Sequence, residues 1–184
     1  MIFVQDQYFT TETFKALQDY CNNNEFQKVE TEGKDFFVLE TPKELIPLLQ
    51  FSGHELVLSF IRMADKNHNT TPSIHADNLI NGHKTALASV LYINNEEDVS
   101  KNGTAFYSHN YYKRELPENI SNEEFDKLLK EDSNDPLKWQ IKDIITSVPN
   151  RMLTYSSNQF HAKFPSKIER GTRIVLVCFY TKKS

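Results

Sequence analysis

The segment Ser73-Ile-His-Ala-Asp-Asn78 holds a histidine and an aspartate that are separated by one residue, His75 and Asp77. Alternate side chains of a strand point to one face, so a strand here would project the imidazole and the carboxylate together. Two histidines and one carboxylate on one face of a metal form the ligand set of non-haem Fe(II) oxygenases. This pair would supply two of those three ligands, and the alternative is a surface loop with two solvated polar groups.

A histidine and an arginine far along the chain could complete such a site. His161 follows a predicted strand, and only tertiary folding could bring it to His75. Arg173 is the second residue of a predicted final strand and shares a face with Val175 and Val177. Burying an unpaired guanidinium is costly, but its planar fork can bind a carboxylate through two hydrogen bonds. The alternative is an arginine at the wet end of its strand.

Length and composition indicate one domain without an obvious charged partner. The chain has 184 residues, enough for a substantial core, and a net charge of −4 that makes nucleic acid or an anionic membrane an unlikely target. Cys21 and Cys178 form no CxxC motif. We expect a cytoplasmic protein with unpaired thiols, one disulfide being the alternative. We see no signal peptide and no apolar run of the ~20 residues that a membrane span needs.

Residues 1–55 predict a helical support for the rest of the domain. A helix is expected from Thr10 or Thr11 to about Tyr20, because Phe14, Leu17 and Cys21 give it one apolar face. A short strand is expected at 36–39. Thr41-Pro-Lys-Glu44 has the pattern of a capping box, so it predicts a short helix, which Pro47 would bend.

The remaining sequence predicts mostly strands. Strands are expected at 56–63, around His75, and at 85–94, 103–107, 139–148, 151–155 and 172–181. We expect 65–72 and 79–83 to be loops and 94–102 an acidic turn. In 85–94 one face is small until Tyr92, as expected beside a cavity. This pattern favours an antiparallel sandwich or barrel flanked by helices, a mainly β (α+β) fold.

Residues 110–138 are predicted to be a helical insertion into that fold. Ser121-Asn-Glu-Glu124 forms a capping box before an apolar stripe that includes Phe125 and Leu128. Ser133-Asn-Asp-Pro136 should end this helix. Tyr107, Tyr111 and Tyr112 could line a substrate groove or pack the insertion against the barrel, and we expect Trp139 to be a core residue.

The order of these parts resembles the Fe(II)/2-oxoglutarate dioxygenase superfamily, over residues 56–181. It is most similar to the prolyl-4-hydroxylase-type branch with its small bacterial and phage members. The resemblance implies a double-stranded β-helix (jelly roll) with His75, Asp77 and His161 as iron ligands. It also implies that Arg173 and Tyr92 bind a carboxylate of 2-oxoglutarate. Val175 fits this branch, whereas Arg62 and Met63 stand where other members often have a tyrosine that contacts the co-substrate.

The resemblance implies a hydroxylase that uses Fe(II), 2-oxoglutarate and dioxygen, releases succinate and carbon dioxide, and is possibly stimulated by ascorbate. The substrate would be a peptide, a prolyl residue or a small molecule. Two alternatives remain open, a non-catalytic jelly-roll binding or structural module and a cupin-like metalloenzyme that does not use 2-oxoglutarate.

Several other polar residues have both a functional and a plain interpretation. Asn78 could orient Asp77 or be an ordinary turn residue. Positive charge near His161 would suit an anionic substrate, although a solvated loop explains it equally well; it comes from Lys163, Lys167 and Arg170. The other histidines are expected at the surface, with the third or fourth able to reach a pocket mouth; they are His54, His68, His83 and His109.

Overall fold

The computed structural model describes residues 1–31, 34–67, 73–94, 102–169 and 171–183. Its helices are α1 (Thr11–Asn23), the 3-10 helix η1 (Lys43–Leu49), α2 (Asn122–Lys127), the π-helical turn η3 (Leu128–Asp132) and the 3-10 turn η4 (Pro136–Lys138). Its strands are β1 (Ile2–Gln5), β2 (Gln27–Thr31), β3 (Lys34–Glu40), β4 (His54–Asp65), β5 (Leu79–Ile80), β6 (His83–Lys84), β7 (Leu87–Tyr92), β8 (Gly103–His109), β9 (Trp139–Thr146), β10 (Met152–Ser156), β11 (His161–Phe164) and β12 (Thr172–Lys182).

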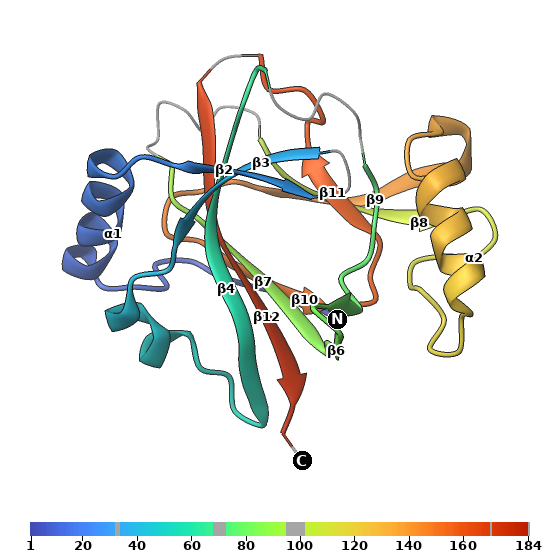
Figure 1. Cartoon of the computed structure of the whole chain (residues 1–184), viewed down its shortest axis with the longest axis horizontal. Coiled ribbons are helices and arrows are strands. Elements are labelled where there is room, and N and C mark those ends of the chain that lie inside the picture. The colour runs from blue at the N-terminus through green and yellow to red at the C-terminus, as the bar shows by residue number, and fades with distance from the viewer. Residues whose placement is uncertain (32–33, 68–72, 95–101, 170, 184) are drawn as a thin grey trace.

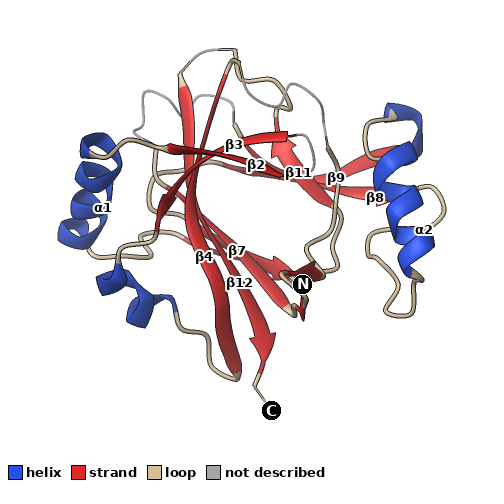
Figure 2. Cartoon of the chain, viewed as in Figure 1, coloured by secondary structure: helices blue, strands red, loops and turns tan. Residues whose placement is uncertain are grey.

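Two antiparallel sheets form the centre of the molecule, and the helices α1 and α2 lie at its opposite sides (Figures 1 and 2). The major sheet has the strand order β1-β10-β7-β12-β4-β3-β2, and the minor sheet has the order β11-β8-β9. The short strands β5 and β6 pair with each other. Non-consecutive strands are neighbours throughout the major sheet, so distant parts of the chain meet side by side.

Three apolar clusters hold these layers together, because alternate residues of a strand face opposite sides. Strand β7 shows this division as the sequence predicted: Leu87 and Leu91 pack under α1 and η1 in one cluster, whereas Ala88 and Val90 face the minor sheet in another. The third cluster joins the far side of the minor sheet to the segment around α2. The cluster between the sheets is the layer that borders the polar site described below.

The N-terminal support agrees with the sequence in its helix but not in its second cap. Thr10 caps α1, and Phe14, Leu17 and Cys21 are buried as predicted. The capping box predicted at Thr41–Glu44 is wrong. Pro42 occupies the cap position, no side chain caps the helix, and η1 is a 3-10 helix that contains Pro47. The Thr41 hydroxyl is instead buried without a hydrogen-bond partner among the described residues.

Most predicted strands are confirmed, and the exceptions are short or depend on distant partners. The segment around His75 is not a strand, because it forms a single antiparallel bridge with His161. The 79–83 segment contains the two-residue strands β5 and β6 rather than only loop. Strands β1, β2 and β11 were not predicted. The predicted acidic turn at 94–102 lies largely outside the described residues.

Residues 110–138 carry α2, η3 and η4, and their apolar side chains pack against the outer face of the minor sheet. The Ser121 capping box is confirmed, since the Ser121 hydroxyl accepts from the Glu124 N–H while the Glu124 carboxylate accepts from the Ser121 N–H. Tyr107 and Trp139 meet edge to face beneath this segment. Their packing favours the structural interpretation of these aromatic residues.

Both cysteines, Cys21 and Cys178, are buried free thiols, as predicted. Among the described residues, no helix combines the length and the apolar character needed to span a membrane.

Candidate metal centre

Three side chains that are distant in sequence bring their ligand atoms together. One ligand atom from each of His75, Asp77 and His161 lies within 4.8 Å of the others. The Nε2 atom of His75 is 3.5 Å from Asp77 Oδ1, and the Nε2 atom of His161 is 3.2 Å from Asp77 Oδ2. Asp77 and His161 are buried, whereas the His75 side chain is 41% exposed and reaches solvent. Two imidazole nitrogens and a carboxylate could therefore hold one metal ion from one side.

Backbone hydrogen bonds fix the two segments that carry these side chains. His75 and His161 exchange both backbone bonds, with N···O distances of 3.1 and 2.9 Å. Two residues further along, the Asp77 N–H donates to the Ser157 carbonyl at 2.7 Å. Paired residues of an antiparallel bridge project to the same side, so the two imidazoles lie next to each other with ring centroids 4.5 Å apart.

Each histidine is held in the tautomer that suits a metal ligand. The Nδ1–H of His75 donates to the Ser73 carbonyl at 2.7 Å, and the Nδ1–H of His161 donates to the Gln159 carbonyl at 2.9 Å. A carbonyl can only accept, so both protons lie on Nδ1 and both Nε2 lone pairs point towards Asp77. Such hydrogen bonds to the second ring nitrogen also orient metal-binding histidines.

The charges of the three groups support one another. Burial opposes the negative charge of Asp77, but His161, His75 and the Tyr155 hydroxyl together hold the pKa of its carboxyl below the usual value. The loss of hydration, together with His161 nearby, lowers the pKa of His75. His75 is therefore neutral near pH 7, which is the form that binds a metal.

Tyr155 is a residue of the site that sequence reasoning missed. Its buried hydroxyl donates to Asp77 Oδ2 at 3.1 Å and lies 2.9 Å from His161 Nε2. It reaches the site from β10, where Leu153 shares its face. A tyrosine near the end of an apolar strand is ordinary core in sequence, so no local signal marks it. Asn78, which was considered as the partner of Asp77, has a buried Oδ1 without a hydrogen-bond partner among the described residues.

Arg173 is buried at the head of β12, beside Tyr92, and the wet-end alternative is wrong. Its guanidinium carbon lies 5.8 Å from the centre of the Tyr92 ring, and its Nη2 donates weakly to the Gly103 carbonyl at 3.5 Å. Its Nε has no hydrogen-bond partner among the described residues. The Tyr92 hydroxyl donates to Thr104 at 2.8 Å. An incompletely paired guanidinium inside the sandwich is a suitable partner for a carboxylate.

Two more cations lie near this arginine. The Arg62 guanidinium stacks over Phe36, with 4.5 Å between its central carbon and the ring centre. Burial, with Arg173 nearby, lowers the pKa of Arg62 to about 10, while Asp77 acts in the opposite direction. Burial, followed by Arg173 and Arg62, lowers the pKa of Lys163 to about 8. These three cations therefore act on one another next to the candidate ligands.

The segment before His75 is bound to the end of η3. The Ile74 N–H donates to the Ser133 carbonyl at 3.0 Å, and the Ser133 hydroxyl donates back to the Ile74 carbonyl at 2.9 Å. The Ser73 N–H donates to the side chain of Asn134 at 2.8 Å. Since the Ser73 carbonyl receives the His75 Nδ1–H, this attachment also fixes the imidazole.

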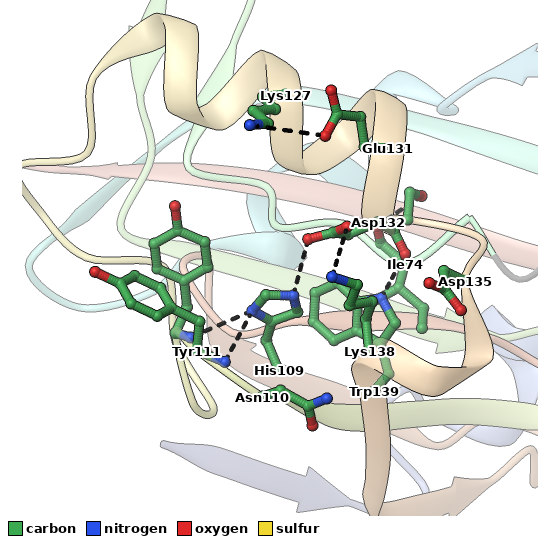
Figure 3. Close-up of polar contacts among 12 residues, drawn as sticks. Ile74, His109, Asn110, Tyr111, Lys127, Glu131, Asp132, Asp135, Lys138 and Trp139 are labelled. Carbon is green, nitrogen blue, oxygen red and sulfur yellow. Dashed lines mark hydrogen bonds and ion pairs between the residues drawn. The ribbon is translucent and has the colours of Figure 1, made fainter.

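Figure 3 shows how the attachment point itself is fixed to the minor sheet. Asp132 accepts from the His109 imidazole at 3.1 Å through its side chain, and from the Trp139 indole at 2.7 Å through its backbone carbonyl. The Nδ1 atom of His109 accepts from the backbone N–H groups of Tyr111 and Tyr112. His109 is therefore a buried structural residue, and its expected surface position is wrong.

Replacing Ser133 with alanine should disturb both the fold and the metal site. The Ile74 carbonyl would lose a buried hydrogen bond, which should lower the free energy of unfolding by about 1–3 kcal/mol in denaturant titrations. Because the His75 support loosens, metal affinity should fall about tenfold in calorimetric titrations. Ser121→Ala is the matched control, since it removes a cap from α2 and should leave metal affinity unchanged. Equal metal affinity in both variants would contradict a link between η3 and His75.

The other histidines and charged residues have no printed contact with this centre. His54 begins β4, and its Nδ1 donates to the Ser52 carbonyl, while His83 is exposed on β6. His68 and Arg170 lie outside the described residues, and Lys167 is exposed. The plain surface interpretation therefore holds for His83 and Lys167.

No protein-family model matches the chain, and no curated protein matches it either. Solved structures do match, at low identity. One is the non-haem α-ketoglutarate-dependent carbocyclase SnoK from nogalamycin biosynthesis, at 10% identity and a TM-score of 0.65, covering 98% of this chain and 79% of that one. A prolyl-4-hydroxylase from Pseudomonas putida has 12% identity and a TM-score of 0.56 over 100% and 93% of the two chains.

A third match is HygX from Streptomyces hygroscopicus, a structure with nickel, 2-oxoglutarate and hygromycin B bound. Its identity is 11% and its TM-score 0.59, over 99% of this chain and 83% of that one. At such identities the likeness concerns the fold alone. The predicted jelly roll, a mainly β fold with flanking helices, is confirmed.

Proposed function

We propose that the chain is an Fe(II)- and 2-oxoglutarate-dependent dioxygenase that hydroxylates a C–H bond. We place it in the prolyl-4-hydroxylase-like branch, with a peptide, a prolyl residue or a small molecule as substrate. In this proposal, residues 1–184 form one oxygenase domain, with 1–55 as its helical support and 110–138 as a helical insertion. The observation that carries the proposal is the convergence of His75, Asp77 and His161 within 4.8 Å.

The donor set and the buried arginine both fit the proposed cofactors. Two neutral imidazoles with one carboxylate suit Fe(II) better than magnesium or calcium, which prefer oxygen ligands. The unpartnered Nε of Arg173 supports a role in binding the distal carboxylate of 2-oxoglutarate, with Tyr92 beside it. When bound, these cofactors supply the oxidising chemistry, which converts 2-oxoglutarate and dioxygen to succinate, carbon dioxide and one oxygen atom for the substrate.

The side chains of this protein would then contribute geometry and electrostatics. His75 and His161 present Nε2 because their Nδ1 protons are bound to carbonyls. Tyr155 holds one oxygen of the Asp77 carboxylate. Val175 and Phe106, from the two facing sheets, line the apolar layer beside these groups, and apolar walls keep water from a reactive centre.

The test is anaerobic reconstitution of the purified chain with Fe(II), followed by addition of oxygen, ascorbate and 2-oxoglutarate. We expect metal-dependent succinate release, even in the absence of the substrate, at a low rate. His83→Ala is the control for histidine loss at an exposed position and should behave as the wild type. A chain that binds no metal would contradict the proposal and favour a non-catalytic jelly-roll module. Metal binding without any 2-oxoglutarate binding would favour the cupin-like alternative.

A further inference from the structure

The inward face at one end of the sandwich carries three cationic side chains. On β12 and β4, Val175 pairs with Arg62, and Arg173 pairs with Ala64. Paired residues of antiparallel strands project to the same side, so Arg62 and Arg173 are diagonal neighbours on one face. The residues of this face include Val175 and Phe60, which belong to the apolar cluster between the two sheets.

Lys163 reaches the same space from the minor sheet. It stands two residues after His161 on β11, so both side chains project to the same face. It pairs with Thr104, whose hydroxyl accepts a hydrogen bond from Tyr92. Arg62 and Lys163 therefore approach the space around Arg173 from the two opposite sheets.

The three cations differ in their access to solvent. Arg173 is 7% exposed, whereas Arg62 and Lys163 are only partly buried. A ligand that arrives after the co-substrate would meet the two accessible cations and not the buried one. Arg62 is also held in place, because its guanidinium stacks on Phe36.

The charges that the proposed function brings do not neutralise this group. An Fe(II) ion and a 2-oxoglutarate dianion cancel each other in net charge. Three cations then face one ligand carboxylate, Asp77, so that two positive charges remain among these groups. Partly buried cations of like charge are unfavourable unless an anion joins them.

We propose that Arg62 and Lys163 form a second anion-binding site beside the metal centre, which takes a carboxylate or phosphate group of the primary substrate. This inference rests on the proposed function and narrows its substrate class to anionic molecules or acidic peptides. Arginine suits the task because its fork binds two oxygens of an anion, and lysine adds a point charge. The expected substrate carries its anionic group at a distance from the C–H bond that is hydroxylated.

The test uses the chain loaded with Mn(II) and 2-oxoglutarate, because Mn(II) is a paramagnetic stand-in for Fe(II). Inorganic phosphate is titrated in one arm and propionate in the other, and NMR follows the relaxation that Mn(II) causes in each probe. We expect saturable relaxation of at least one probe, which identifies the preferred anion. Arg62→Gln and Lys163→Gln should each weaken this binding at least fivefold, while their affinity for 2-oxoglutarate stays within threefold of the wild type.

Lys167→Gln is the matched control, because Lys167 is an exposed lysine of the segment that follows β11. It should leave the binding of both probes unchanged, and thermal melting should show that all variants are folded. The proposal would be overturned if neither probe binds, or if Lys167→Gln weakens binding as much as Lys163→Gln. It would also be overturned if Arg62→Gln and Lys163→Gln mainly weaken 2-oxoglutarate, since the two cations would then serve the co-substrate.

A failure of the proposed function would look different. If Mn(II) does not bind, calorimetric titration of phosphate and propionate into the metal-free chain decides the anion site by itself. Binding that both glutamine variants lose would support the anion site although the oxygenase assignment fails. Binding that survives in both variants, or no binding, would overturn it.

Discussion

Asp77→Ala is expected to lose metal binding, with an affinity at least about 100-fold below that of the wild type. Substitutions of residues that merely support a ligand typically cost 10–100-fold, so the loss of a ligand should cost more. Asp77 is also the only anion among the three candidate ligands, and its oxygens lie 3.5 Å and 3.2 Å from the two Nε2 atoms. Anaerobic calorimetric titration with Fe(II), or with Mn(II) in air, measures the change.

The control for this variant is a loss of carboxylate away from the centre. Asp143→Ala removes the exposed partner of Arg114 and should leave metal affinity unchanged. The melting temperature without metal reports on the fold, and the rise of that temperature on metal addition should disappear only in Asp77→Ala. An unchanged metal affinity in Asp77→Ala would remove this residue, and with it the triad, from the proposed function.

Arg173→Ala is expected to weaken 2-oxoglutarate binding roughly 100-fold, with metal affinity unchanged. Hydrogen bonds to charged groups contribute about 1.5–3 kcal/mol each, and 1.4 kcal/mol corresponds to a factor of ten. The guanidinium is buried and its Nε lacks a partner among the described residues, so little solvent competes for the carboxylate. Titration of 2-oxoglutarate into the Mn(II)-loaded protein gives the dissociation constant directly.

Arg173→Lys separates charge from shape at this position. Lysine keeps the positive charge but cannot bind both carboxylate oxygens in a fork, so its affinity should fall between those of alanine and the wild type. Arg114→Ala, which removes an exposed arginine, should have no effect. If Arg173→Ala binds 2-oxoglutarate as tightly as the wild type, Arg173 does not bind the co-substrate.

The candidate site was predictable where residue type and strand periodicity coincide. His75 and Asp77 are one residue apart, and an extended backbone is enough to place them on one side. Arg173 was conspicuous because it heads an otherwise apolar strand face. By contrast, nothing local distinguishes Tyr155 from a core tyrosine. Its role depends on the pairing of β10 with β7, which sets its depth beside Asp77.

The fold was predictable in its strands and faces but not in its pairings. Strand β11 has four residues and mixed polarity, and it exists because β8 pairs with it along Gly103–Phe106. The bridge between His75 and His161 likewise joins segments that share no sequence signal. At Thr41, the proline that follows determined the geometry of the helix start, and the expected cap did not form. Long-range pairing and local proline geometry override propensities in these places.

The central position of β12 has a consequence for synthesis on the ribosome. β12 lies between β7 and β4 in the major sheet, although it follows every other strand along the chain. During translation, β4 and β7 therefore leave the exit tunnel with unfilled edges that other nascent chains could pair with. A polypeptide stalled before residue 172 would lack both the middle of its sheet and Arg173. Slow elongation near that point would favour co-translational aggregation, whereas chaperone cover over β4 and β7 would favour the native jelly roll.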